Sequence, residues 1–245
     1  YGDISIEADE LTLSDLTVFA EGDVDFNASV NVNGDVVVSS YSGDGDISFN
    51  GGGSAANDGS DTLTLAAGAG DILIDGGDFA SEEDPLGQLN VLSATDFTIG
   101  APFDVFTLDI GFFDVSGSVD LGDTLTVLGE DAFIINATDI FGALTAPNAE
   151  SVTILATGVI GESNAESDNP FVANTTGPLR FIGAGGVIEG TFGGGDVQGF
   201  TWLGDLSGNI FVINGVTVVF EPPLDVEEVI NSIIIIPAIP DTDVD

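Results

Sequence analysis

Hydrophobic and polar residues alternate with a period of two in short segments along the whole chain. Ile4 and Ile6 flank Ser5, and Leu63 and Leu65 flank Thr64. Such alternation places the apolar side chains on one face of a strand and the polar ones on the other, as in a half-buried strand. The pattern therefore predicts an all-β chain.

A Gly-Asp dipeptide opens many of these segments. It does so at Gly2, Gly22, Gly45 and Gly70, positions that lie 20, 23 and 25 residues apart. Another copy at Gly34 falls inside one interval, as if each period held more than one strand. A near-uniform period is typical of solenoids and is not needed by a sandwich. We therefore predict a parallel β-solenoid of about ten coils and about 50 Å, with an antiparallel β-sandwich as the alternative.

A second group of segments shares an apolar-Thr-apolar pattern, and two of its members, 62 residues apart, are separated by close to three periods. This predicts that the group also repeats with the coils. The members of the group are Leu11-Thr12-Leu13, Leu63-Thr64-Leu65, Phe97-Thr98-Ile99, Leu125-Thr126-Val127, Val152-Thr153-Ile154 and Val216-Thr217-Val218.

Three polar segments, residues 51–60, 78–87 and 162–169, are read as loops between strands.

The pattern changes near the end of the chain. Two apolar segments flank Asn214-Gly215, which is the signal for a tight hairpin. Pro222-Pro223 then ends the repeats, so we divide the chain into a solenoid at 1–221 and an extension at 222–245. The extension is predicted to hold a short helix over 224–232 and an apolar strand. That strand either caps the last coil or is donated to a neighbouring subunit; its residues are Ile233, Ile234, Ile235, Ile236 and Ile239.

Composition excludes several classes of function. The chain has no His and no Cys, so the Ser-His-Asp and Cys-His catalytic arrangements and the usual zinc sites are ruled out. With 42 acidic residues, one basic residue and a formal net charge of -41, it is not expected to bind nucleic acid. Yet 43% of the residues are hydrophobic, which predicts a folded core rather than a disordered acidic chain. No apolar run is long enough for a transmembrane helix.

An extracellular location is expected. The sequence starts at Tyr1 without Met, as after removal of a secretion signal. Three Asn-X-Ser/Thr triplets offer glycosylation acceptors, at Asn27, Asn136 and Asn174.

The Gly-Asp openings, the Leu-Thr-Leu strands, Ala156-Thr157-Gly158-Val159-Ile160-Gly161 and the closing stretch 208–215 together resemble the passenger regions of filamentous-haemagglutinin-type exoproteins exported by two-partner secretion. The resemblance implies a right-handed parallel β-helix, secretion from a Gram-negative-type cell, and a role in adhesion or in surface fibres. The near absence of Lys and Arg and the short length depart from that family.

Few chemical options remain. Paired carboxylates suffice for glycoside hydrolysis, but in so acidic a chain they discriminate nothing. Arg180 is a candidate base or, with more support, the partner of a nearby carboxylate. No cofactor is expected apart from calcium, because the Gly/Asp-rich turns offer hard oxygen ligands. The candidate calcium ligands are Asp44, Asp46, Asp58, Asp61, Asp75 and Asp78, and ordinary solvated turns are the competing interpretation.

Packing in a stacked core is the ordinary explanation for a group of aromatic residues near the middle of the chain and for two later ones. These residues are Phe97, Phe103, Phe106, Phe112, Phe113, Phe133, Phe200 and Trp202. An exposed row would instead indicate a platform for sugars. The sequence thus favours a secreted, non-catalytic subunit of an extracellular fibre or matrix, or an adhesin stalk, that assembles with itself. A monomeric, calcium-dependent module that binds surface glycans is the alternative.

Overall fold

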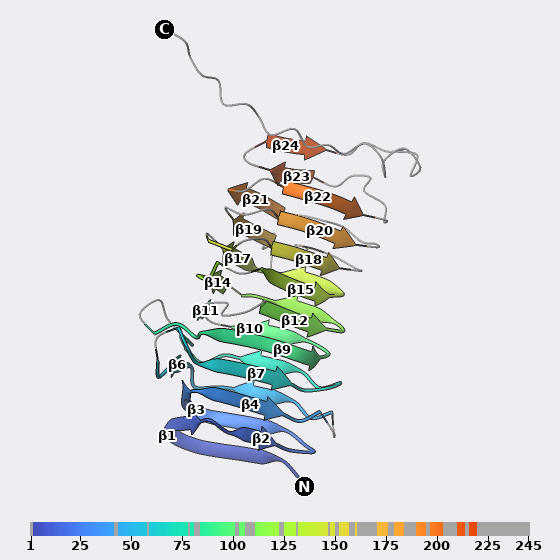
Figure 1. Cartoon of the computed structure of the whole chain (residues 1–245). Coiled ribbons are helices and arrows are strands. Elements are labelled where there is room, and N and C mark those ends of the chain that lie inside the picture. Colours follow the sequence, from blue (N-terminus) through green and yellow to red (C-terminus); the bar gives the residue numbers. More distant parts are fainter. Residues whose placement is uncertain are drawn as a thin grey trace.

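The computed structural model of the chain is a parallel β-solenoid (Figure 1). It describes residues 2–41, 44–57, 59–77, 79–80, 84–100, 103–105, 111–122, 125–130, 132–146, 148–149, 152–156, 160, 171–175, 179–183, 190–194, 197–202, 210–213 and 216–219, and only the backbone of 103–105, 111 and the segments after 160. Three sheets of stacked strands run along the solenoid: the eight-stranded and nine-stranded sheets begin in the first coil, the eight-stranded sheet ends at residue 141, and the seven-stranded sheet begins at residue 103. The predicted fold class is confirmed, and the parallel pairing excludes the sandwich.

The eight-stranded sheet begins with two long strands that bend around a corner of the coil. It contains β1 (Ile4–Ser14), β3 (Val24–Asn33), β5 (Ile47–Phe49), β8 (Ile72–Ile74), β10 (Phe97–Ile99), β13 (Ser118–Asp120) and β16 (Asp139–Phe141), with β6 (Gly53–Ala55) beside the second half of β3.

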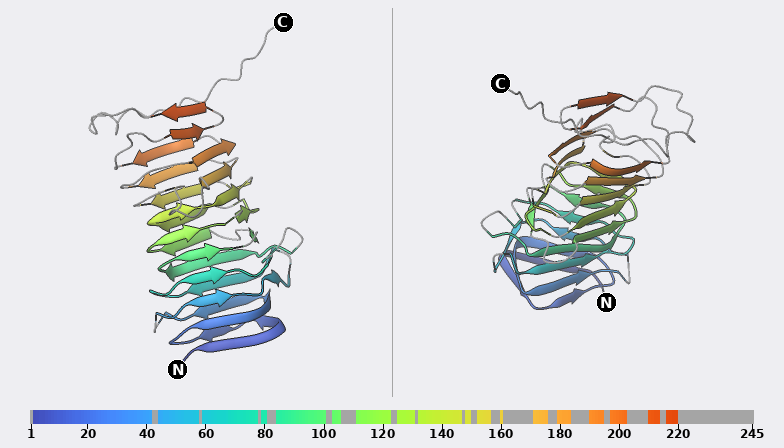
Figure 2. Two further views of the ribbon diagram at one scale, coloured as in Figure 1. Left: turned by 180° about the vertical axis from the view of Figure 1, so that it is seen from behind. Right: turned by 45° about the horizontal axis from the view of Figure 1, so that its top comes forward.

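The nine-stranded sheet forms the second side of the stack, and Figure 2 shows both sides from behind and from above. Its strands are β2 (Thr17–Phe19), β4 (Asp35–Ser39), β7 (Thr62–Ala66), β9 (Gln88–Ala94), β12 (Gly111–Val115), β15 (Phe133–Ala137), β18 (Val152–Ala156), β20 (Leu179–Gly183) and β22 (Val197–Trp202). At the usual strand spacing these nine strands span about 38 Å.

The seven-stranded sheet closes the third side. Its strands are β11 (Phe103–Val105), β14 (Leu125–Val127), β17 (Ala143–Ala146), β19 (Phe171–Thr175), β21 (Gly190–Gly194), β23 (Ile210–Ile213) and β24 (Val216–Val219). β23 and β24 pair antiparallel with Ile213 opposite Val216, which confirms the predicted hairpin.

The register of the strands follows the Gly-Asp repeat. Val24 lies over Ile4, Ile47 over Val24 and Ile72 over Ile47, so each Gly-Asp dipeptide occupies the same corner of its coil. Glycine is required at this corner because a Cβ at Gly45 would overlap the carbonyl of Gly22 in the coil before it. Gly34-Asp35 lies at the start of β4, in the nine-stranded sheet. The prediction that one period holds several strands is therefore confirmed.

The apolar-Thr-apolar segments occur in all three sheets and so do not mark a single position of the coil. Leu63–Leu65 lies in the nine-stranded sheet, Phe97–Ile99 in the eight-stranded sheet and Leu125–Val127 in the seven-stranded sheet. Alternation alone specifies a strand with one buried face, and all three sheets need such strands. The loop predicted at 51–60 is partly wrong, since Gly53–Ala55 forms β6 and pairs with β3.

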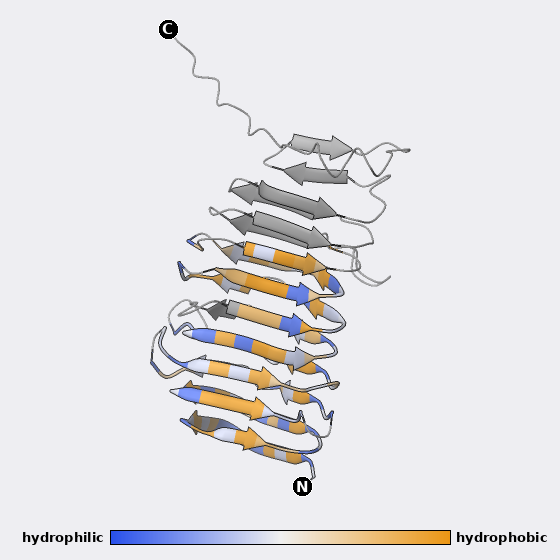
Figure 3. Cartoon of the chain, turned by 45° about the vertical axis from the view of Figure 1, so that its right-hand side comes forward, coloured by the Kyte–Doolittle hydropathy of each residue, from blue (hydrophilic) through white to orange (hydrophobic). Residues whose placement is uncertain are grey.

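The core is one continuous apolar column between the three sheets. Phe26 stacks on Phe49 with ring centroids 4.9 Å apart, and Phe113 meets Phe97 and Phe133 edge to face, each at 5.0 Å. All five rings are buried. Hydropathy alternates along the strands (Figure 3), with apolar side chains directed inward. The core interpretation is thus confirmed for Phe97, Phe113 and Phe133 and is wrong for Phe112, which alternates with Phe113 and is half-buried on the outer face.

The extension at 222–245, with its predicted helix and Ile233, Ile234, Ile235, Ile236 and Ile239, lies outside the described residues. In the part of the chain that is described, no helix is long and apolar enough to cross a membrane.

Candidate functional site

One corner of the solenoid carries a row of stacked aspartates that we call the aspartate ladder: Asp3, Asp23, Asp46, Asp71 and Asp96. The Oδ1 atom of each accepts a hydrogen bond from a backbone N–H one coil further on. Four of these donors are the backbone N–H groups of the next aspartate in the ladder, with N–Oδ1 distances of 3.3, 3.0, 2.8 and 3.1 Å. The fifth is the N–H of Ser118, which donates to Asp96 at 2.6 Å. The repeated Gly-Asp dipeptide is therefore explained by structure: glycine permits close stacking and aspartate satisfies the turn amide of the following coil.

A shallow groove of about 440 Å³ lies against this ladder and is bordered by Asp25, Ser48 and Thr98 on the adjoining strands. Ser48 Oγ donates to Asp25 Oδ1 at 2.5 Å, so the outer face also carries hydrogen bonds between coils. Stacked carboxylates about 4.8 Å apart repel one another, and water and dissolved ions screen this repulsion because most of the ladder is exposed.

The hydrogen bonds along the ladder and the repulsion between its carboxylates together give a prediction for Asp46. The Asp46→Ala variant loses the acceptor for the Asp71 N–H and should be destabilised by about 1 kcal/mol. The Asp46→Asn variant keeps an acceptor oxygen and removes one repelling charge, so it should unfold at a higher temperature than the wild type in low salt. Thermal unfolding at low and at 1 M salt measures both effects. An Asp46→Asn variant that behaves like Asp46→Ala would refute the capping role.

The predicted calcium ligands are dispersed in the structure. Asp44 Oδ1 accepts from the Ala69 N–H at 3.2 Å, Asp46 belongs to the ladder, and Asp75 Oδ1 accepts from the Gly76 N–H at 2.6 Å. Asp58 and Asp78 lie outside the described residues. Among the residues that are described, no group of three or more acidic side chains is placed to hold a metal ion.

Asp61, another predicted ligand, is instead a buried structural group with 1% of its surface exposed. Its Oδ1 accepts from Gly34 N at 2.6 Å and from Asn57 Nδ2 at 2.8 Å, and its Oδ2 accepts from Asn57 N at 2.5 Å. Both oxygens therefore bind protein donors. The Gly-Ser-Asp sequence at 59–61 gives no sign of this, because the donors come from a turn four residues earlier and from the preceding coil.

The same corner, on the side of the nine-stranded sheet and in later coils, carries a polar groove of about 370 Å³ that we call the corner groove. It follows the ends of strands in the nine-stranded sheet, and its polar lining consists of Ser93, Asp114, Ser116, Asn136 and Thr138. Asn136 Nδ2 donates to Asp114 Oδ1 at 2.7 Å, so the two side chains hold each other across adjacent coils. Ser116 and Thr138 donate their hydroxyl hydrogens to the backbone oxygens of Ala94 and Ser116, at 3.1 and 2.7 Å.

Apolar side chains lie on the strands next to this polar pair. Leu92 is the extra residue of a β-bulge in β9, where the register shifts against both neighbouring strands, and 51% of its surface is exposed. Phe112 and Ile134 are register partners on the outer face of the same sheet and are half-buried, as is Leu155, the partner of Asn136 in β18. This arrangement could not be predicted from the sequence, because the bulge that exposes Leu92 leaves no mark in the alternation of apolar and polar residues.

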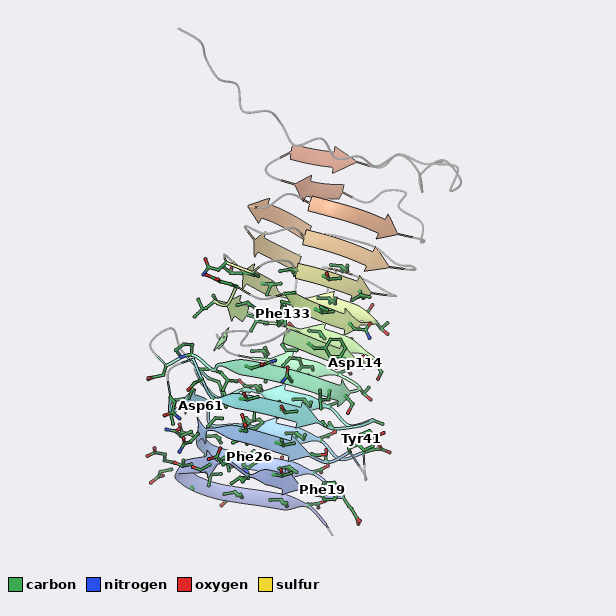
Figure 4. All side chains as sticks on the ribbon, viewed as in Figure 1. Phe19, Phe26, Tyr41, Asp61, Asp114 and Phe133 are labelled. Atoms are coloured by element: carbon green, nitrogen blue, oxygen red, sulfur yellow. The ribbon has the colours of Figure 1, made fainter. Side chains whose placement is uncertain are left out.

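Exposed aromatic side chains lie on the same flank in earlier coils. Phe19 ends β2 and is 51% exposed, and Tyr41 follows β4 and is 64% exposed. Figure 4 shows both on the side of the stack that carries Asp114, with Phe26 and Phe133 inside. Neither residue belongs to the aromatic group for which the sequence raised a sugar platform, which lies at residues 97–133, 200 and 202.

Two of the predicted glycosylation acceptors have described side chains. Asn27 is exposed in β3 and its Oδ1 accepts from Asn50 Nδ2 at 3.1 Å, whereas Asn136 is half-buried in the corner groove. The side chains of Asn174 and Arg180 are not among those described; their backbones belong to β19 and β20, where Arg180 pairs with Thr153.

Comparison with models of protein families, with curated proteins and with solved structures finds no match to this chain.

Proposed function

We propose that this chain is a secreted, non-catalytic structural protein, a subunit of an extracellular fibre or matrix or the stalk of an adhesin, that associates by stacking its first coil on another β-coil. The observation that carries the proposal is the incomplete burial of the apolar side chains in the first coil. Ile4, Ile6, Leu11, Leu16 and Val18 pack against the core but are only partly buried. Their counterparts in the second coil, among them Val24, Phe26, Val30 and Val38, are 0% exposed.

Backbone groups support the same interpretation. β1 and β2 are the end strands of their sheets, each with one neighbour among the described strands. The outward N–H and C=O groups of such strands are free to pair with a further strand. Another coil would satisfy these groups and cover the apolar residues in a single step.

The first coil also carries features that restrict which coils can stack on it. β1 contains a bulge between Glu7 and Glu10, and its centre carries three exposed acidic residues, Glu7, Asp9 and Glu10. Charges and bulges on edge strands oppose indiscriminate pairing. Repulsion between such strands is screened by salt. Association should therefore grow stronger as the ionic strength rises from 10 mM to 150 mM.

A charge placed in the exposed column tests the proposal. The Ile6→Asp variant should abolish association, because stacking would bury an unpaired carboxylate. Ser5→Asp is the matched control: it adds the same charge to the preceding residue of β1, which faces outward and is exposed. Sedimentation velocity of both variants and the wild type over a range of concentrations gives the result. Equal association of Ile6→Asp and wild type would reject stacking through the first coil.

The parallel solenoid fold is consistent with the filamentous-haemagglutinin-type exoproteins that the sequence resembles, and this likeness supports the proposed secretion and surface location. A strand donated by residues 233–239 is a second proposed contact. Deletion of the residues after Pro223 tests it separately, since that deletion leaves the first coil unchanged.

A further inference from the structure

We propose that the corner groove and the exposed aromatic side chains beside it bind a linear, uncharged glycan. This inference goes beyond the proposed assembly, because it concerns the flank of the stack and not its end. It rests on three features that lie on one flank: a fixed polar pair, an apolar surround and an aromatic side chain at a distance.

The polar pair is preorganised. The hydrogen bond from Asn136 Nδ2 to Asp114 Oδ1 fixes both side chains at 2.7 Å. It leaves Asp114 Oδ2 and Asn136 Oδ1 as acceptors and the second amide hydrogen of Asn136 as a donor. Adjacent hydroxyl groups of a sugar ring both donate and accept hydrogen bonds, so they match this set. The nearby Ser116 and Thr138 hydroxyls already donate to backbone oxygens and can still accept.

The apolar surround supplies the second part of such a site. Leu92 is placed outward by the β9 bulge, next to the row that contains Asp114 and Asn136, and Phe112 and Ile134 flank that row on the outer face. A few oriented polar groups within an apolar surround are typical of small-molecule sites. The C–H face of a sugar ring packs on apolar side chains while its hydroxyls reach the polar pair.

Charge selects the class of glycan. The chain carries a net charge of -41, and the groove contains a carboxylate, so uronate-containing and sulfated polysaccharides are repelled. An uncharged glycan meets no such barrier.

Distance indicates a chain of sugars rather than a single one. Tyr41 follows β4, and Asp114 lies in β12, three strands further along the nine-stranded sheet. At the usual strand spacing this is about 14 Å along the stack. A ligand that touches both must therefore contain several sugar units.

Affinity electrophoresis of the full-length protein tests the inference, with the linear, uncharged polysaccharides pullulan or lichenan cast into native gels. At least one of these uncharged polymers should retard the wild type. Asp114→Ala should weaken binding about ten- to hundredfold, and Tyr41→Ala about two- to tenfold. The corresponding monosaccharides should compete poorly.

The matched control is Asp25→Ala. Asp25 accepts from Ser48 Oγ between coils on the outer face of the eight-stranded sheet, so this variant removes the same charge and the same kind of bond away from the groove. It should bind like the wild type. The inference is overturned if none of the uncharged polymers retards the protein, or if Asp25→Ala and Asp114→Ala weaken binding equally. Retardation by alginate, or by chitosan alone, would overturn the proposed ligand class. Sedimentation velocity shows whether each variant still associates. A loss of glycan binding can therefore be distinguished from a loss of stacking.

Discussion

Replacing Phe113 by alanine is expected to lower the free energy of unfolding by about 3–5 kcal/mol. Phe113 is fully buried and its ring lies 5.0 Å from the rings of both Phe97, in β10, and Phe133, in β15. Its removal leaves a cavity in the middle of the column, and strands paired on both sides of β12 cannot close in to fill it. Urea unfolding followed by circular dichroism measures the change.

The adjacent residue provides the control. Phe112 points outward from the same strand and is half-buried, so Phe112→Ala should cost well under half as much. If the two variants were equally destabilised, or if Phe112→Ala had the lower free energy of unfolding, the assignment of inner and outer faces in β12 would be wrong.

Replacement of Asp61 by alanine should cost about 3 kcal/mol. The buried carboxylate accepts from the backbone N–H groups of Gly34 and Asn57 and from the Asn57 side chain, which joins two coils and one turn. Alanine leaves those donors without a partner in a site that water does not reach. The midpoint of urea unfolding should fall with little change in its slope, since the folded and unfolded surfaces stay nearly the same.

Asp75→Ala is the comparison for Asp61. Asp75 is exposed, and its Oδ1 accepts from the neighbouring Gly76 N–H, which water can reach when the carboxylate is removed. This variant should lose less than about 1 kcal/mol. A calcium-dependent rise in melting temperature that disappears in Asp61→Ala but not in Asp75→Ala would contradict the structural role given to Asp61 and restore the predicted metal ligand.

The repeat of Gly-Asp made the fold predictable from sequence. Because Gly22, Gly45 and Gly70 stack in one corner, their spacing is the length of a coil, and the register confirms it. Alternation within strands is set by burial on one face and identified the inward residues correctly, as at Ile47 and Phe49.

The assignment of strands to sheets could not be predicted. All three sides of the coil require the same alternation, so Leu63–Leu65 and Leu125–Val127 look alike in sequence although they lie in different sheets. The surface features were hidden for a related reason. Asp61 gains one donor from the preceding coil and two from the Asn57 turn, and Leu92 is exposed by a local shift in register. Neither arrangement is marked by the alternation of apolar and polar residues.

Electron microscopy of the full-length protein at micromolar concentration in 150 mM salt tests the central claim most directly. The account predicts unbranched particles of one coil's width whose length grows with concentration, while Ile6→Asp gives rods of a single length. Particles that stay at one length at every concentration, or that widen instead of lengthening, would contradict an open first coil that stacks on another.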